Sequence, residues 1–207
     1  MRIAELSRRA GVPVPTIKFY LREGLLPPGE PTGRNQADYS DPHLQRLRLV
    51  QALRGVGGLT VAATREVVRT LDEPLLDRHE LMGVAHRAVI RPGRHDPADP
   101  DWARARAEAA GWVRELGWQV GPAAPALDQL ADVVLAARQV DRADLLDDLP
   151  SYAGAALSVA EQEVAAAAGA GDPAAVMAAV VTGTVLGEAL LSAVRLMAHE
   201  HVSAQTA

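Results

Sequence analysis

The sequence has 207 residues, no cysteine, and 26 acidic against 21 basic side chains, for a net charge of −5. This length accommodates a small domain and one further core, and the composition is that of an ordinary globular protein. The lack of cysteine excludes disulfides, thiolate metal sites and thiol redox sensing. Residues 1–70 hold 11 basic and 6 acidic side chains, whereas residues 71–207 hold 10 and 20. A basic N-terminal part on an acidic remainder suits nucleic-acid binding at one end.

The first predicted elements are two short helices joined by a tight turn. Ile3, Leu6 and Ala10 recur at helical spacing, and Gly11 can take the left-handed conformation that ends a helix. Pro15 suits the first turn of a second helix, because its missing N–H needs no partner there. This order predicts a helix-turn-helix.

The second helix is predicted to have one apolar and one exposed face. Ile17, Tyr20 and Leu21 share the apolar side, and Gly24 ends the helix. The opposite face could enter a major groove of DNA, where basic side chains would neutralise phosphates and the others would contact bases or sugars. The alternative is a helical hairpin whose basic residues are only solvated. The residues on this face are Thr16, Lys18, Phe19 and Arg22.

A small β wing is predicted next, because turn-forming residues crowd positions 27–35 between two stretches that could pair as strands. Arg34 would lie near its tip and Tyr39 on its return arm, both suited to backbone contacts with DNA. Ser40 is then predicted to cap a third helix, and Thr60 to cap a fourth.

Over about residues 1–71, the order of these motifs resembles the MerR family of transcriptional regulators. Three separated motifs agree: the run from Thr16 to Leu26, the wing, and residues 46–50 followed by Gly-Leu-Thr-Val at 58–61. The resemblance implies a winged helix-turn-helix dimer that holds a distorted, palindromic promoter site together with RNA polymerase. It places Tyr20 in the recognition helix beside the residues named above, and Arg34 and Tyr39 in the wing.

Two features depart from the family pattern. Lys18 stands where the family often has arginine, and lysine lacks the planar fork that contacts guanine in two places, so a phosphate contact is expected. The glycine pair at 57–58 adds one residue before the expected second wing.

Residues 72–101 are predicted to be a connecting helix over 75–89 and a proline-rich loop over 91–97. The family resemblance implies a long coiled-coil helix at this place. The stretch over 75–89 is short and has no sustained heptad, so dimerisation is expected further along the chain.

Residues 102–207 are predicted to be an all-helical dimerisation and effector-binding domain, divided at residues 121–122, 150 and 171–173. The last helix, over about 173–202, is the most apolar. Glu188 and Arg195 interrupt it and argue against a membrane span, so a buried bundle helix is expected. The predicted fold class is therefore all-α with a small β wing.

About the last sixty residues resemble the C-terminal helices of TetR-type regulators, which pair across a dimer as a four-helix bundle. This resemblance implies an effector cavity among the helices between Trp102 and Tyr152, although ordinary core packing is the alternative for each residue. The lining candidates, large or adaptable groups suited to an apolar effector, are Trp112, Trp118, Tyr152, Met177 and Met197.

The function predicted from these features is a cytoplasmic, non-enzymatic regulator that binds promoter DNA as a homodimer and responds to a small apolar effector. No cofactor, metal or membrane partner is expected: the histidine pairs lack a third ligand, and no catalytic motif or secretory segment is present. Two alternatives stay open, an effector-free architectural or developmental DNA-binding protein and a small-molecule-sequestering protein with a vestigial head. Dimerisation by a MerR-type coiled coil or by a TetR-like bundle also stays open.

Overall fold

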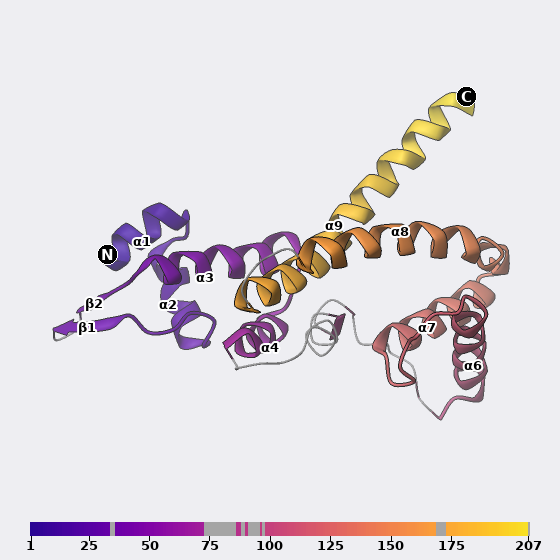
Figure 1. Cartoon of the computed structure of the whole chain (residues 1–207), viewed down its shortest axis with the longest axis horizontal. Coiled ribbons are helices and arrows are strands. Elements are labelled where there is room, and N and C mark those ends of the chain that lie inside the picture. Colours follow the sequence, from indigo (N-terminus) through magenta and orange to yellow (C-terminus); the bar gives the residue numbers. More distant parts are fainter. Residues whose placement is uncertain are drawn as a thin grey trace.

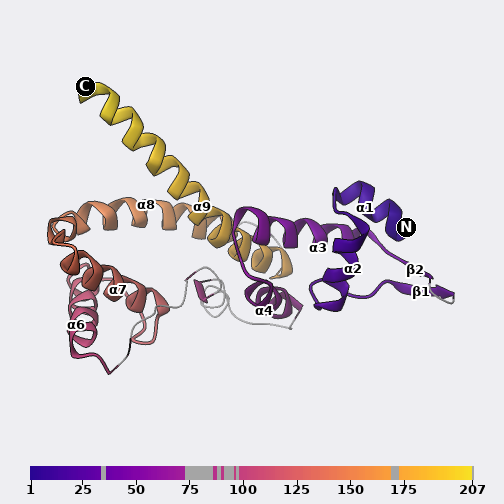
Figure 2. The same cartoon turned by 180° about the vertical axis from the view of Figure 1, so that it is seen from behind.

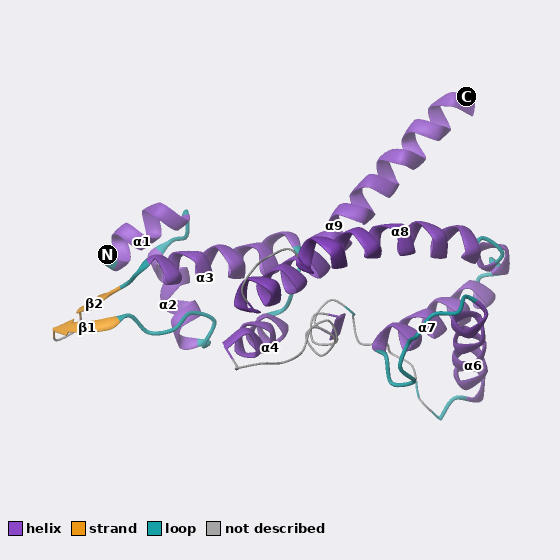
Figure 3. Ribbon diagram, in the orientation of Figure 1, coloured by secondary structure: helices purple, strands orange, loops and turns teal. Residues whose placement is uncertain are grey.

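The computed structural model describes residues 1–33, 36–72, 86–87, 90, 96, 98–168 and 173–206 of the chain. The described residues are mostly helical, with one two-stranded antiparallel sheet, as the sequence predicts (Figure 3). The molecule is elongated, and its N-terminal elements lie at the end opposite to the α6–α7 pair (Figure 1). Arg34, most of the predicted helix over 75–89 and most of the loop over 91–97 lie outside the described residues.

The head, residues 1–72, contains the helix-turn-helix and the wing. Gly11 ends the first helix with a φ of 67°, and Gly24 follows the second with a φ of 71°, which are left-handed conformations that suit glycine. The third and fourth helices are joined by one π-helical turn. The elements are α1 (Ile3–Ala10), α2 (Val14–Arg22), β1 (Glu30–Gly33), β2 (Gln36–Asp38), α3 (Asp41–Gln51), η1 (Ala52–Val56) and α4 (Val61–Asp72).

Both predicted helix caps are confirmed. At the start of α3 the Ser40 N–H donates to Nδ1 of His43 at 3.1 Å, so the two residues form a reciprocal capping box. At the start of α4 the Ala63 N–H donates to the Thr60 hydroxyl oxygen at 3.1 Å. These bonds satisfy backbone groups that the first turn of a helix leaves without partners.

The wing is anchored to the N-terminus. Strand β1 pairs with β2 so that Glu30 faces Asp38. Directly after β2, the Tyr39 N–H donates to the Met1 carbonyl at 2.8 Å, and the N-terminal ammonium donates to the Tyr39 carbonyl at 2.6 Å. The chain passes Gly29 so closely that a Cβ there would lie 2.7 Å from the Asp38 carbonyl. The base of the hairpin is therefore held against the helix-turn-helix.

The body, residues 98–206, consists of two helical layers. The first is the antiparallel pair α6 (Pro100–Glu115) and α7 (Pro125–Gln139), followed by the short turn η2 (Ala143–Leu146). Alanines buried at the contact allow the two helices to approach closely. The Trp102 indole N–H donates to Asp132 at 2.8 Å and links the two helices. The second layer is α8 (Leu149–Ala168) and α9 (Pro173–Thr206).

The first part of α9 lies against the head, beside α4 and η1 (Figures 1 and 2). Val181 and Val185 are buried and belong to the same hydrophobic cluster as the interior of the head. Close packing there depends on Gly57, because a Cβ at that position would overlap Cγ1 of Val185 and lie 2.7 Å from the Leu53 carbonyl. The head therefore shares its core with a helix more than a hundred residues away in the sequence.

The second part of α9 projects away from the rest of the chain (Figure 1). Leu190 is 65% exposed and Met197 is 60% exposed. The expectation that the last helix is buried therefore holds only near its start, because no other described element of this chain reaches its outer half. In the described part of the chain, Ala178–Thr206 is also the one stretch long and apolar enough to cross a membrane by length and composition.

Candidate nucleic-acid interface

Helix α2 presents an open basic face. Its first turn contains Pro15, and its apolar side buries Ile17 in the core of the head. Lys18 and Arg22 are exposed, and Thr16 is half-buried. Within the described residues neither Lys18 nor Arg22 forms an ion pair. Their charges are therefore available to an anion from outside the chain.

Five other arginines of the head have acidic partners within it. The Arg65 guanidinium joins α4 to the end of α2, because its Nε donates to the Glu23 carbonyl at 2.7 Å and its terminal group pairs with the Glu23 carboxylate. Arg46 similarly joins α3 to the last turn of α4 through Asp72. Three further pairs are Arg2–Asp38, Arg8–Glu5 and Arg9–Asp41.

Tyr20 is buried, with 6% of its surface exposed. Its ring centroid lies 5.9 Å from that of Phe19. The guanidinium of Arg54, a residue of η1, lies 5.9 Å from the Tyr20 centroid. This is the packing expected from its place on the apolar side of α2, and it leaves Phe19 half-exposed beside it. A direct DNA contact from Tyr20 stays a prediction.

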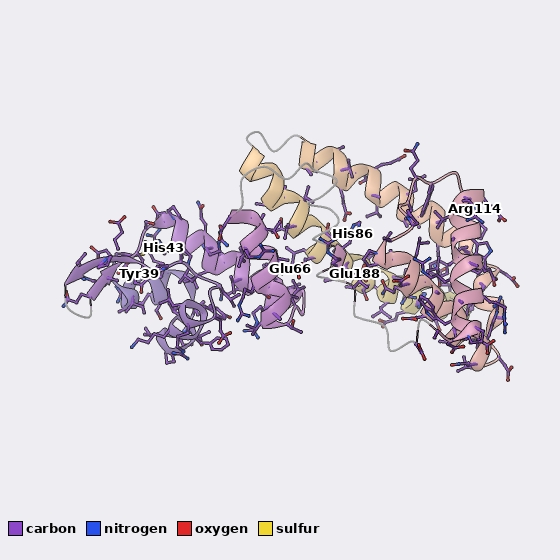
Figure 4. The ribbon with its side chains drawn as sticks, turned by 90° about the horizontal axis from the view of Figure 1, so that it is seen from below. Tyr39, His43, Glu66, His86, Arg114 and Glu188 are labelled. Atoms are coloured by element: carbon purple, nitrogen blue, oxygen red, sulfur yellow. The ribbon has the colours of Figure 1, made fainter. Side chains whose placement is uncertain are left out.

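Tyr39 lies at the base of the wing and is 8% exposed. Its ring meets the edge of His43 at a centroid distance of 5.3 Å (Figure 4). Burial raises the pKa of the Tyr39 phenol. The structure thus gives Tyr39 a packing role in positioning the wing, and its contact with DNA stays a prediction. Arg34, at the tip, lies outside the described residues.

The sequence interpretation placed Arg54 on the polar flank of the third helix and missed the π-helical turn that presents it. The Gly57 N–H donates to the Ala52 carbonyl at 3.0 Å, which closes this wider turn. Arg54 Nε is buried and, within the described residues, has no hydrogen-bond partner. The sequence feature that marks this turn is the glycine pair at 57–58. Gly57 leaves room for Val185, and Gly58 adopts a φ of 66°.

The predicted effector-lining residues whose side chains the structure describes differ in exposure. Trp112 and Trp118 are half-buried, whereas Tyr152 is 51% and Met197 60% exposed. The side chain of Met177 is outside the described set. Trp112 lines a small cavity of about 280 Å³ beside η2 and the start of α8. An effector role for the five stays a prediction.

A larger cavity lies between the head and the body. Its volume is about 1190 Å³. It is bounded by the loop before α4, by His86, Arg87 and Ile90, and by α7, α8 and α9. His86 and Glu188 both line it and are labelled in Figure 4. The walls of α8 and α9 consist largely of alanine, glycine and valine. The sequence predicts an effector cavity among the helices between Trp102 and Tyr152. The observed cavity lies closer to the head.

A helix-turn-helix with an unpaired basic face and an anchored β hairpin defines the class of winged helix-turn-helix transcription regulators. Residues 1–71 match the family model of MerR HTH family regulatory proteins. The chain belongs to the MerR family of transcriptional regulators. Members of this family bind promoter DNA and are not enzymes, and a transcription regulator acts inside the cell.

Two curated relatives are similar to part of the chain. The HTH-type transcriptional regulator ZntR homolog of Haemophilus influenzae is 40% identical over 50 residues, 24% of this chain and 37% of the relative. The HTH-type transcriptional regulator HmrR of Rhizobium leguminosarum bv. viciae is 40% identical over 57 residues, 28% of this chain and 43% of the relative. The match thus spans less than half the length of either relative.

One solved structure is similar to the whole chain. It is the crystal structure of the putative transcriptional regulator SCO5550 from Streptomyces coelicolor A3(2), which is 37% identical with a TM-score of 0.72. The match covers 99% of this chain and 97% of that one. The helical body is therefore a shared feature of at least two chains, and the likeness of this body to TetR-type regulators stays a prediction.

Proposed function

We propose that this chain is a cytoplasmic transcription regulator that binds a palindromic promoter site as a homodimer and acts there with RNA polymerase. The observation that supports this most directly is the exposed, unpaired pair Lys18 and Arg22 on α2. Phosphate contacts from such side chains position a recognition helix and give most of the salt-dependent affinity. Thr16 and Phe19, half-buried on the same helix, are the proposed base or sugar contacts.

The proposed dimer interface is the outer half of α9. Leu190, Val194 and Met197 follow one another at intervals of four and three residues, so they share one face of the helix, and all three are exposed. The opposite face has Ser192, Arg195 and His199, at intervals of three and four residues. A helix that is apolar on all sides suits a lipid bilayer. A helix with an apolar stripe on one side and a polar stripe on the opposite side suits packing against a second helix.

A second copy of the chain is the proposed occupant of this stripe. Residues 190–206 extend about 25 Å at a rise of 1.5 Å per residue. Further exposed apolar side chains on α8, among them Tyr152 and Leu157, enlarge the area available to a partner. Stable interfaces bury about 800 Å² per partner, and two helices from each copy can supply such an area. This arrangement is a four-helix bundle.

We further propose that a small, largely apolar effector controls the protein. The cavity between head and body favours this function over an effector-free architectural role, because a body that only dimerises needs no space of ligand size. One of its walls is the loop before α4, so an occupant would contact the head directly. An effector that binds two arrangements of head and body unequally would shift the population between them.

The proposed function is tested by fluorescence anisotropy with the promoter DNA upstream of the chain's own reading frame, titrated across salt. We expect tight binding whose logarithm falls linearly with the logarithm of the salt concentration. Lys18→Glu should abolish it. Equal binding by the wild-type chain and this variant, or no binding to any palindromic promoter fragment at low salt, would overturn the proposal.

A further inference from the structure

One histidine joins the wing to the third helix. His43 lies in the first turn of α3, is half-buried, and contacts both arms of the hairpin at its base. Its Nε2 lies 3.3 Å from the carbonyl oxygen of Pro28, which precedes β1. Its ring stands at 89° to that of Tyr39, which directly follows β2 (Figure 4). The imidazole therefore bridges the entry and the exit of the wing.

The two arms lie close together where His43 contacts them. A Cβ on Gly29, between Pro28 and β1, would lie 3.0 Å from Cε1 of Tyr39 and 2.7 Å from the Asp38 carbonyl oxygen. These distances leave no room for another side chain, so the first arm packs directly on the second. A group that holds Pro28 and Tyr39 at once thus fixes where the hairpin leaves the head.

The neighbours of the imidazole determine its protonation state. The Ser40 N–H can only donate, and its nitrogen lies 3.1 Å from Nδ1 of His43, so Nδ1 must be the unprotonated, accepting nitrogen. The Pro28 carbonyl can only accept, so Nε2 must carry the hydrogen. The two backbone partners thus assign His43 as a neutral ring with its hydrogen on Nε2.

A second proton would disturb this arrangement. A protonated Nδ1 would direct its hydrogen at the Ser40 N–H, so two donors would face each other. The Ser40 hydroxyl oxygen, 2.8 Å from Nδ1, can accept that hydrogen, but the Ser40 N–H then loses its acceptor. The added charge would also lie at the N-terminus of α3, where the helix dipole disfavours a cation. Both effects favour the neutral ring while the wing is in place.

No carboxylate among the described residues offsets this cost by pairing with His43. Asp41 is paired with Arg9 at 2.9 Å, and Asp38 is paired with Arg2 at 3.5 Å. The phenol of Tyr39 is neutral near pH 7, and burial raises its pKa further. The titratable and charged side chains on the elements around His43 are those of Arg9, Glu30, Asp38, Tyr39, Asp41 and Arg46.

We propose that neutral His43 is a positioning residue for the wing in DNA binding, and that its protonation releases the wing and weakens promoter binding. The inference goes beyond the proposed function and rests on it. Histidine ordinarily changes its charge between about pH 5 and about pH 8. His43 is the only histidine in residues 1–78, and its half-buried ring is accessible to water. Mild acid therefore acts on the head through this residue.

The direction of the effect separates this proposal from general electrostatics. Acid makes the chain more positive, and added positive charge ordinarily tightens DNA binding. Release of the wing acts in the opposite direction, because contacts from the hairpin are then no longer held in line with α2. A decrease in affinity on acidification is thus the specific sign that His43 has been protonated.

The test is fluorescence anisotropy of the full chain with its upstream promoter DNA, from about pH 7.5 to about pH 5.5 at constant salt. Wild-type affinity should fall at least about tenfold, because each copy takes up one proton when the wing is released. His43→Gln should remove this decrease, since glutamine can accept from the Ser40 N–H in a capping box and does not titrate. His199→Gln, in an exposed residue of α9, is the matched control and should retain the decrease.

A second measurement needs no DNA. Nitrogen-15 NMR of the full chain near neutral pH should show an unprotonated Nδ1 and a protonated Nε2 for His43, whose signals are identified by their absence from His43→Gln. His43→Ala removes both backbone bonds and should bind promoter DNA more weakly than His43→Gln over the whole pH range. Circular dichroism at each pH checks that every variant is folded.

The proposal is overturned if wild-type affinity does not fall on acidification, or if His43→Gln retains the wild-type pH dependence. A hydrogen on Nδ1 of His43 near neutral pH would overturn it as well. Any of these results alongside salt-dependent promoter binding would leave the regulator function standing. No promoter binding by the wild-type chain at any pH would overturn the proposed function, together with the role of His43.

Discussion

The head and the body of this chain bury their apolar side chains to different degrees. In the head, Leu6, Ile17, Leu25 and Leu47 are at most 1% exposed. In the body, the residues buried between α6 and α7 are mostly alanines, and many large apolar side chains of α8 and α9 face solvent. The core side chains of the head are therefore buried within one chain, whereas the body has apolar surface that a single chain leaves exposed to solvent.

This difference indicates which part of the chain needs a partner to cover its apolar surface. Within the described residues, Val181 and Val185 of α9 complete the main core of the head. Most of the large apolar side chains of the head are buried, and Lys18 and Arg22 are exposed, which suits a surface that meets DNA. The body has both an apolar stripe and an unfilled cavity, which suit a second copy and a ligand. Four predictions test this division of roles.

The largest effect is expected from reversing the free charges of the head. The double variant Lys18→Glu, Arg22→Glu should weaken promoter binding by on the order of a thousandfold at low salt, because each copy loses two phosphate contacts and gains repulsion. Anisotropy titrations at several salt concentrations measure this. Arg104→Glu in the body, an exposed residue of α6, is the control and should bind normally. Equal losses in both variants would mean that DNA contacts are not confined to the head.

The next largest effect concerns the apolar stripe of α9. Val194→Glu places a charge in the proposed dimer interface and should yield a monomer, as measured by light scattering after size-exclusion chromatography. Promoter affinity should fall by about a hundredfold, because two linked half-site contacts become independent. Ser192→Glu introduces the same charge on the opposite face and should remain dimeric. A dimeric Val194→Glu protein would place the interface elsewhere.

A smaller effect is expected where head and body share a core. Gly57→Ala should lower the free energy of unfolding by about 1–3 kcal/mol, because its methyl group would overlap Val185 and force the packing apart. Urea denaturation monitored by circular dichroism measures it. Gly55→Ala, two residues earlier, has open space around its Cβ and should be neutral. If both variants behave alike, α9 does not dock on η1 in solution.

The smallest effect is a pH dependence in the body. Burial raises the pKa of Glu163 in the folded chain, so folding favours its protonated form, and stability should decrease as pH rises through the raised pKa. Urea denaturation followed by circular dichroism from about pH 4 to about pH 8 measures this slope. Glu163→Gln, which cannot ionise, should flatten the slope, and an unchanged slope would contradict the prediction.

The local elements of the head could be predicted from the sequence because their signals are local. Gly11, Ser40 and Thr60 act within one helical turn, and each has the predicted role. The outward position of Lys18 also follows from helical spacing alone. Prolines predict the helix breaks in the body for the same reason, since proline removes a backbone donor wherever it occurs.

Contacts between distant segments could not be predicted in this way. No pattern within α9 indicates that Val185 enters the head, because a valine on an apolar face suits any neighbour. The cavity depends on which small residues of α8 and α9 face each other across the chain, and the predicted lining residues were chosen for size instead. Large side chains such as Tyr152 and Met197 are exposed in the single chain. A helix of a second copy is expected to cover them.

Lys18 has a chemical consequence beyond its charge. It is the only lysine in this sequence, and it is exposed on the recognition helix. The other amine, at the N-terminus, donates a hydrogen bond to the Tyr39 carbonyl at 2.6 Å. An amine-directed acylating reagent therefore labels the side chains of this protein at one place, the middle of the proposed DNA contact. Without any engineered tag, mass spectrometry of the labelled chain would then report how fully the recognition helix is covered.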